Sequence, residues 1–309
     1  MLPAQSLDSL LVSKIELHRY DEAKELVEKG ANVNTIQHFQ TPLTAVVNRM
    51  WDLSDTVFYS WLLSKGAAIN FSPGGYTGTS MYAAASSQTL GSRAQIVRFL
   101  IRNGAKVNVD EGQPEPIKGA LTYNCWDVIS VLMDNGAKLP SYALAKAMAE
   151  MRYSKYKDAQ GALTEYGKLV EKLVNDSLQL RGRHELFTPL GHAIKNGNLE
   201  ITTMLLQKGA PVDKVEGPGG WSSVMLASYK QVAEKEPADR LAIIQLLVQK
   251  GANAKQDSKL EYQQKLTHHP CPVIPKGSNA LDAAILSGAP QPVIDYLKTL
   301  GVEQVTSKK

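Results

Sequence analysis

The residues of this chain that could bind a metal ion gather at His268-His269-Pro270-Cys271, where two histidines and one cysteine fall within four positions. A tetrahedral zinc site needs three or four such ligands, commonly supplied as two spaced pairs. No second CxxC or HxxxH pair occurs, and the side chains of adjacent histidines point in diverging directions. We therefore favour a loop with incidental His and Cys over a metal site, and we expect neither a metal nor another cofactor. The other cysteine, Cys125, lies in the turn-like NCWDV and is expected to be structural.

Residue patterns of other chemistries are missing or stand in the wrong context. Neither GxSxG nor HExxH occurs, and no Cys/His pair has a recognisable catalytic context. GPGG (217–220) and SPGGYTG (72–78) lack GxGxxG spacing and a preceding strand, so turns are favoured over phosphate-binding loops. Glu234 and Glu236 lie in a charged stretch that offers no apolar environment for acid–base chemistry. The sequence therefore predicts a protein that is not an enzyme.

Composition sets the class of protein. The chain has 309 residues, 43% of them hydrophobic, and a formal net charge of +4 with acids and bases interspersed. Such a balance does not indicate a nucleic-acid binder. No apolar run approaches the roughly 20 residues that a membrane span needs, and the first residues lack the pattern of a signal peptide. A soluble protein is expected, with cytoplasm and periplasm both left open.

The elements that would position any site follow from a repeated marker, in which Gly-Ala is followed by small or β-branched residues. The glycines of the first four copies are separated by 36, 38 and 32 residues. The next gap is 73 residues, about twice a unit, and GKLVEKLVNDS (167–177) is a degenerate copy inside it. The clear copies are GANVN (30–34), GAAIN (66–70), GAKVN (104–108), GAKLP (136–140), GAPVD (209–213) and GANAK (251–255).

Two helices are predicted before each marker. The first begins at a Thr, Ser or Asn, often followed by Pro, as in TPLTAVV (41–47) and TPLGHAI (188–194). These are the residues preferred at a helix N-cap and first turn. The second carries an apolar pattern such as ITTMLLQKGA (201–210) and ends at Gly, which accepts the left-handed conformation. Each unit is therefore predicted to be helix, turn, helix and extended loop.

These units resemble ankyrin repeats, whose pattern includes T-P-L-H-x-A. The resemblance implies an all-α solenoid of about eight helix-turn-helix units with β-hairpin-like finger loops, forming a single domain over 1–309. The predicted units span about 6–34, 41–70, 79–108, 115–140, 141–177, 188–213, 222–255 and 279–303. The His of the pattern is replaced by Thr44, Tyr82, Lys118, Gly191, Met225 and Asp282, which implies a less regular array.

The resemblance also implies a concave groove that binds partner proteins through finger tips and inner helices. Its aromatic and charged residues are of types that dominate binding hot spots. Carried over position by position, the partner-binding candidates are Phe39, Asn48, Arg49, Trp51, Tyr76, Tyr123, His192, Lys195, Trp221, Tyr229 and Lys230. Trp61 and Trp126, at outer-helix positions, are expected to cover neighbouring units instead.

Irregular segments break the array and are where specificity is expected. SSQTLGSR (86–93), RYSKYKDAQGALTEYG (152–167) and KQVAEKEPADR (230–240) lengthen connections inside units. The longest insertion, 255–279, stands where a finger belongs, and an ordered finger is slightly favoured over disorder.

A non-catalytic protein-binding scaffold is the leading hypothesis for function. It leaves open a simple adaptor and a stoichiometric inhibitor, such as an immunity protein of a bacterial toxin or phospholipase. The alternative is a secreted effector that binds host proteins. An enzyme using 255–279 is the third and least favoured hypothesis.

Overall fold

The helices of this chain are arranged in pairs along the sequence. A computed structural model describes residues 6–50, 53–74, 78–87, 93–152, 155–230, 239–263 and 273–305. The chain forms two compact units, Met1–Pro140 and Ser141–Lys309, and each is described by itself. The prediction of one domain over 1–309 stays a prediction.

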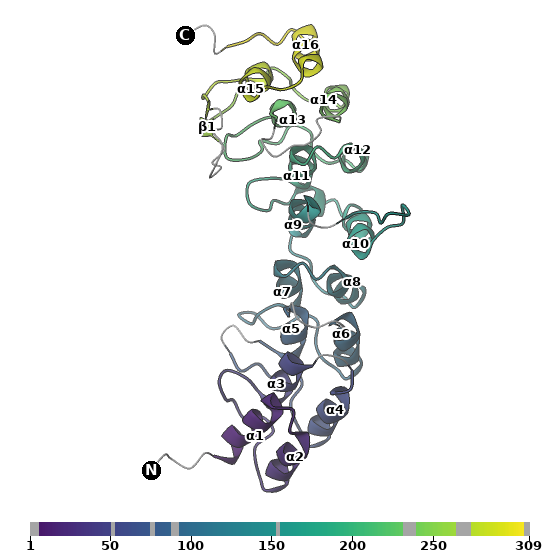
Figure 1. Cartoon of the computed structure of the whole chain (residues 1–309), viewed down its shortest axis with the longest axis vertical. Coiled ribbons are helices and arrows are strands. Elements are labelled where there is room, and N and C mark those ends of the chain that lie inside the picture. Colours follow the sequence, from purple (N-terminus) through teal and green to yellow (C-terminus); the bar gives the residue numbers. More distant parts are fainter. Residues whose placement is uncertain are drawn as a thin grey trace. The chain divides into compact units, whose positions relative to one another are not determined.

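The first unit contains four helix pairs, one in each of the first four predicted repeats. Within it, the first helices of successive pairs pack against one another and the second helices form a parallel row (Figure 1). The helices are α1 (Leu7–Glu16), α2 (Tyr20–Glu28), α3 (Pro42–Arg49), α4 (Thr56–Ser64), α5 (Ser80–Ala85), α6 (Arg93–Arg102), α7 (Pro116–Thr122) and α8 (Trp126–Asp134).

The starts and ends of these helices follow from the local residues. Thr41 caps α3 by accepting a hydrogen bond from the Thr44 amide, and Pro42 occupies the first helical position. After α4, Gly66 has a φ of 90° and turns the chain away from the helix axis. The turn residues of the sequence pattern therefore do what they were predicted to do.

Asparagine side chains join the repeats of the first unit. Asn34 donates to the Gly66 carbonyl at 3.0 Å and accepts from the Ala68 amide at 2.7 Å. Asn70 and Asn108 make the same pair of bonds to the next repeat. Each amide thus satisfies one acceptor and one donor of an extended loop. The equivalent position of the fourth repeat is Pro140, which has no side-chain amide.

The second unit also contains four helix pairs, whose first and second helices form two rows in Figure 1. A two-stranded antiparallel hairpin lies before the last pair, with Tyr262 opposite Ile274. The elements are α9 (Ala143–Ala149), η1 (Glu150–Arg152), α10 (Glu165–Leu173), η2 (Gln179–Arg181), α11 (Pro189–Lys195), α12 (Leu199–Gln207), α13 (Ser223–Ser228), α14 (Arg240–Gln249), β1 (Tyr262–Gln263), β2 (Val273–Ile274), α15 (Ala280–Ser287) and α16 (Gln291–Thr299).

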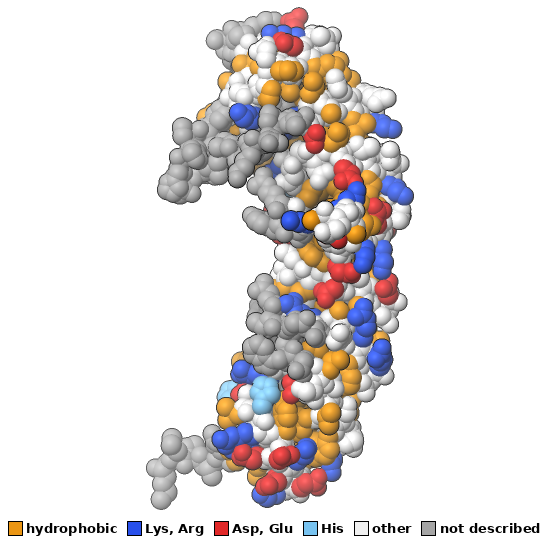
Figure 2. All heavy atoms as spheres, turned by 45° about the vertical axis from the view of Figure 1, so that its right-hand side comes forward, with side chains coloured by type: hydrophobic (Ala, Val, Ile, Leu, Met, Phe, Trp, Pro, Cys, Tyr) orange, Lys and Arg blue, Asp and Glu red, His pale blue; other side chains and the backbone are white. Residues whose placement is uncertain are grey.

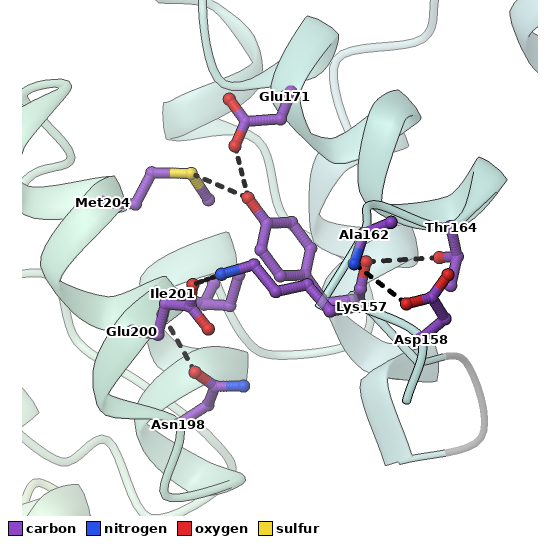
Figure 3. A network of polar contacts seen from close by, with 10 residues as sticks. Lys157, Asp158, Ala162, Thr164, Glu171, Asn198, Glu200, Ile201 and Met204 are labelled. Atoms are coloured by element: carbon purple, nitrogen blue, oxygen red, sulfur yellow. Dashed lines mark hydrogen bonds and ion pairs between the residues drawn. The ribbon is translucent and has the colours of Figure 1, made fainter. Parts of the chain in front are cut away.

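The connection between α9 and α10 contains a hairpin that is fixed to the second row of helices. Lys157 and Leu163 form its β-bridge, and Asp158 accepts bonds from the Gln160 and Ala162 amides at the tip. The Tyr156 hydroxyl donates to Glu171 of α10 and lies 3.8 Å from the sulfur of Met204 in α12. Figure 3 shows Lys157 paired with Glu200. Residues 155–167 of the predicted lengthened segment therefore form a hairpin and the start of α10.

The described residues confirm the predicted fold class, which is all-α and built from helix pairs with finger-like loops. Four isolated β-bridges mark short hairpins outside the strands: three in finger loops and one in the Lys157–Leu163 hairpin. The ends of the long insertion form β1 and β2, while His268, His269 and Cys271 lie outside the described residues.

Candidate protein-binding site

The finger of the second unit that contains GPGG is packed onto aromatic rings. Glu216 and Trp221 form the bridge that closes it. A Cβ on Gly217 would lie 2.8 Å from the Phe187 ring, and one on Gly219 would lie 2.2 Å from Nε1 of Trp221. These glycines are therefore needed for close packing. The structure supports the prediction of a finger turn here.

Two aromatic rings of this repeat meet a third ring from a distant part of the sequence at this finger. The Trp221 ring centroid lies 5.1 Å from that of Tyr229 and 4.9 Å from that of Tyr262, the latter in an edge-to-face arrangement. Tyr262 belongs to the long insertion, and Leu260 donates from its amide to the Gly219 carbonyl at 3.2 Å. Aromatic pairs with these centroid separations are stabilising. The insertion therefore completes the finger of the preceding repeat.

A small hollow opens beside this cluster. Its volume is about 50 Å³, well below the 300–1,000 Å³ or so of a typical small-molecule pocket, so it fits one side chain better than a free ligand. It is lined by Phe187, Lys195, Gly217, Pro218, Gly219, Trp221, Leu226 and Tyr262.

Two groups give this hollow a polar character. The Lys195 ammonium lies 4.7 Å from the centroid of the Phe187 ring, a favourable cation–π distance. The indole Nε1 of Trp221 is buried and has no hydrogen-bond partner among the residues that the structure describes. A buried donor without an acceptor costs free energy, and native proteins contain few of them.

The carboxylate of Glu216 fixes the finger to the start of α11. It accepts hydrogen bonds from the Thr188 amide at 2.9 Å and from the Thr188 hydroxyl at 2.5 Å. Burial raises the pKa of Glu216. A Cβ on Gly191 would lie 2.3 Å from the nearer carboxylate oxygen. Gly191 thus stands in place of the usual His because Glu216 occupies that space, and nothing in the local sequence signals this role of Glu216.

His192 lies inside the unit. Its Nε2 is 3.2 Å from the His184 carbonyl, which places the proton on that nitrogen, and its ring centroid is 5.2 Å from that of Phe187. Burial lowers the pKa of His192, the hydrogen bond to the His184 carbonyl partly opposes this and the nearby Lys195 charge adds to it, so that the pKa lies at about 4. His192 is therefore a buried residue that packs against Phe187.

The low pKa of His192 predicts that the second unit loses stability in mild acid. The unfolded chain takes up this proton near pH 6.5, and the folded chain takes it up only near pH 4. The titration of His192 therefore leaves the free energy of unfolding unchanged above pH 6.5 and lowers it as the pH falls from 6.5 toward 4. We expect a loss of about 1 kcal/mol between pH 7.5 and 5.5 in urea unfolding. Glu216, whose pKa is raised, acts in the opposite direction. His192→Gln keeps a donor and cannot titrate, so a pH dependence unchanged in that variant would contradict the assignment.

The predicted site residues are divided between the two units. In the first unit, Phe39, Asn48, Arg49 and Tyr123 are exposed, and Asn48 donates to the Gln40 side chain at 3.0 Å. Trp51 and Tyr76 lie outside the described residues.

In the second unit, only some of the predicted side chains face solvent. Lys195 and Lys230 are partly exposed, and the Lys230 amide donates to Ser287. Trp221, Tyr229 and His192 are buried, so the free chain uses these three side chains for packing. The sequence pattern predicts a finger-tip position for Trp221 and an inner-helix position for Tyr229, but it does not predict the neighbouring segments that cover these side chains.

A second group of aromatic rings lies on α2 and α4 of the first unit. Tyr20 stacks on Phe58 with a centroid separation of 4.3 Å, and Phe58 stacks on Trp61 at 5.6 Å. The stacking partner of Trp61 lies on its own helix α4, so the expectation that Trp61 covers a neighbouring repeat stays a prediction. Figure 2 shows hydrophobic side chains reaching the surface of this unit between charged ones.

Two further findings bear on function. Among the described residues, no helix combines the length and the apolar character that a membrane crossing requires. That same part of the chain contains no cluster of three or more His, Cys, Asp or Glu side chains placed to hold a metal ion.

Comparison with known proteins identifies the repeat. The ankyrin-repeat family model matches residues 185–216, which include α11 and α12 and end at Glu216, the first residue of the GPGG finger. A search of curated proteins gives no match. Among solved structures, the ankyrin repeat domain of human ASB11 is similar with a TM-score of 0.54 and 20% identity, over 79% of this chain and 98% of that one. Residues 185–216 thus match the ankyrin repeat in sequence, and the fold of the chain is that of an ankyrin-repeat domain.

Proposed function

We propose that this chain is a non-catalytic scaffold that binds a partner protein, and that the hollow beside Trp221 receives one side chain of that partner. Ankyrin repeats generally mediate protein–protein interaction. The observation that carries the proposal is the hollow itself. It is lined by the rings of Phe187, Trp221 and Tyr262, by the glycine finger and by Lys195. Clustered aromatic residues with one cation are typical of interface hot spots.

The chemistry of the hollow favours a partner side chain with an apolar body and an acidic or carbonyl end. The apolar body would contact Phe187 and Tyr262, and the oxygen would face the Lys195 ammonium. The finger is held rigidly by the Glu216–Thr188 bonds, so little entropy would be lost on binding.

We further propose that the bound protein is an enzyme that the chain inhibits stoichiometrically. Immunity proteins of bacterial toxins such as phospholipases act in this manner, and the diverged, insertion-rich array is the sequence feature that suggests it. A secreted effector that binds host proteins is the alternative. If the chain is an inhibitor, an equimolar amount of it should abolish the activity of the enzyme that it binds. If the chain is an effector, it should bind none of the proteins of the organism that produces it.

Photo-cross-linking tests the position of the binding site. Benzoylphenylalanine at Pro218, on the rim of the hollow, should cross-link a partner protein in cell lysate. The same group at the exposed Lys168 of α10 is the matched control and should not. Lys195→Glu should reduce the yield at position 218 about tenfold, the equivalent of 1.4 kcal/mol. Equal cross-linking from positions 218 and 168, or a yield indifferent to Lys195→Glu in a folded variant, would contradict the proposal.

A further inference from the structure

The hollow beside Trp221 brings together two side-chain groups that donate hydrogen bonds and cannot accept them. One is the indole Nε1 of Trp221, and the other is the ammonium of Lys195. Among the described residues that line the hollow, none is Asp or Glu. The hollow therefore offers donors and a positive charge, and its lining side chains carry no negative charge.

The indole donor is buried at the wall of this hollow. Only 4% of Trp221 is exposed, and its Nε1 has no hydrogen-bond partner within the described part of the chain. Gly219 also lines the hollow, and a Cβ on it would lie 2.2 Å from this nitrogen. A buried donor that lacks an acceptor costs free energy. An acceptor bound in the hollow would satisfy this donor and remove that cost.

The positive charge is held in place by an aromatic ring. The Lys195 ammonium lies 4.7 Å from the centroid of the Phe187 ring, which packs against the buried His192 ring. Glu216, the acidic residue of the finger, is not a lining residue, and its carboxylate is bonded to Thr188. An ammonium and an unsatisfied N–H donor beside one hollow form a site for an anion, because hydrogen bonds to charged groups are the strong ones.

The size of the hollow limits the anion. Its volume is about 50 Å³, and a cavity needs about 10–15 Å³ to hold one water molecule. By this measure the hollow has room for roughly three to five non-hydrogen atoms. An anion of the size of a single side chain therefore fits, and a drug-sized ligand does not.

The walls of the hollow select among small anions. Phe187, Leu226 and Tyr262 supply apolar walls, which match alkyl carbons. A carboxylate brings two oxygens for the two donors and can carry a short alkyl chain. Phosphate and sulfate bring four oxygens, and those left without a donor would lose their hydration on entering. A monocarboxylate is therefore the anion that this arrangement fits best.

We propose that the hollow is a binding site for a free small monocarboxylate of the size of acetate or propionate. One carboxylate oxygen accepts from Nε1 of Trp221, and the other faces the Lys195 ammonium. The site belongs to the chain alone, so the inference goes beyond the proposed function and needs no partner. A partner's acidic side chain would require the same hollow, so the free anion would compete with it. Only this competition rests on the proposed function.

Nuclear magnetic resonance of the full chain tests the site through the indole group itself. The chain has four tryptophans, and the Nε1–H signal of Trp221 is the one lost in Trp221→Phe. Replacing Trp51, Trp61 and Trp126 by Phe instead identifies the same signal by elimination. Sodium propionate should shift it saturably, with a dissociation constant of about 1–10 mM, because so small a ligand gains limited affinity.

A neutral ligand and a matched pair of lysine variants provide the controls. Propionamide has the shape of propionate without its charge, and it should leave the Trp221 signal in place, as should sodium chloride at equal ionic strength. Lys195→Met keeps an unbranched side chain and should weaken propionate binding at least about tenfold, because a hydrogen bond to a charged group is lost. Lys168→Met, on the exposed surface of α10, should bind propionate as the wild type does. Thermal unfolding followed by circular dichroism establishes that both variants are folded.

The outcomes separate this inference from the scaffold function. A Trp221 signal that propionate does not shift, or that propionamide shifts equally, overturns the inference. Unchanged propionate affinity in folded Lys195→Met overturns it as well. The titration uses the isolated chain, and the cross-linking from position 218 uses a partner without added carboxylate, so either result can fail without the other.

Discussion

Gly191→His is expected to destabilise the second unit by at least about 2 kcal/mol, although it restores the residue typical of ankyrin repeats at this position. A Cβ here would lie 2.3 Å from a carboxylate oxygen of Glu216. The larger ring would force that carboxylate away from Thr188, whose amide and hydroxyl both donate to it. Overpacking costs about 1–3 kcal/mol, and leaving buried donors unpaired costs about as much again. Urea unfolding followed by circular dichroism measures the difference.

A double-mutant cycle tests the physical reason for this loss. Glu216→Ala should itself be destabilising, because the Thr188 amide and hydroxyl lose their acceptor. In that background Gly191→His should cost much less, because the space is empty. The two residues are in contact, so their effects should not add. A Gly191→His variant as stable as the wild type, or strict additivity, would show that Glu216 does not determine this position.

Leu205→Ala is expected to reduce the free energy of unfolding by about 2–5 kcal/mol. Leu205 lies in α12 and is completely buried. The helix packs against α11 and α14, so truncation leaves a cavity between neighbouring repeats. Because stability in repeat proteins depends on nearest-neighbour interfaces, the loss should spread beyond one repeat.

The same helix provides the control for Leu205→Ala. Gln207 is exposed on α12, and Gln207→Ala should change the unfolding free energy by less than about 0.5 kcal/mol. Urea unfolding of both variants gives the comparison. A loss below about 1 kcal/mol for Leu205→Ala would mean that this leucine is not part of the core.

The repeated helix pairs could be predicted because their signals are local. Thr188 and Pro189 start α11, and Gly209, with a φ of 87°, follows α12. N-caps and left-handed glycines act within one turn of the residue that carries them. The same local residues therefore explain both the eight predicted repeats and the eight helix pairs of the described residues.

The candidate site was predicted less well, because burial depends on segments far apart in the sequence. Trp221 and Tyr229 have the residue types of a binding surface, yet Tyr262 of the long insertion packs against them. Lys195 was predicted and does line the hollow. Phe187 makes the cation–π contact with the Lys195 ammonium. It was missed because no sequence pattern distinguishes its position in a finger loop.

The sequence by itself determined the helix pairs, their order and the turns between them, since each depends on residues within a few positions. Only the tertiary structure decided that Glu216 fills the space above Gly191, that His192 is buried and that Tyr262 packs against Trp221. The reason is physical. A carboxylate, an imidazole or an aromatic ring is assigned to core or surface by the neighbouring repeat that does or does not cover it, and that neighbour is set by long-range packing.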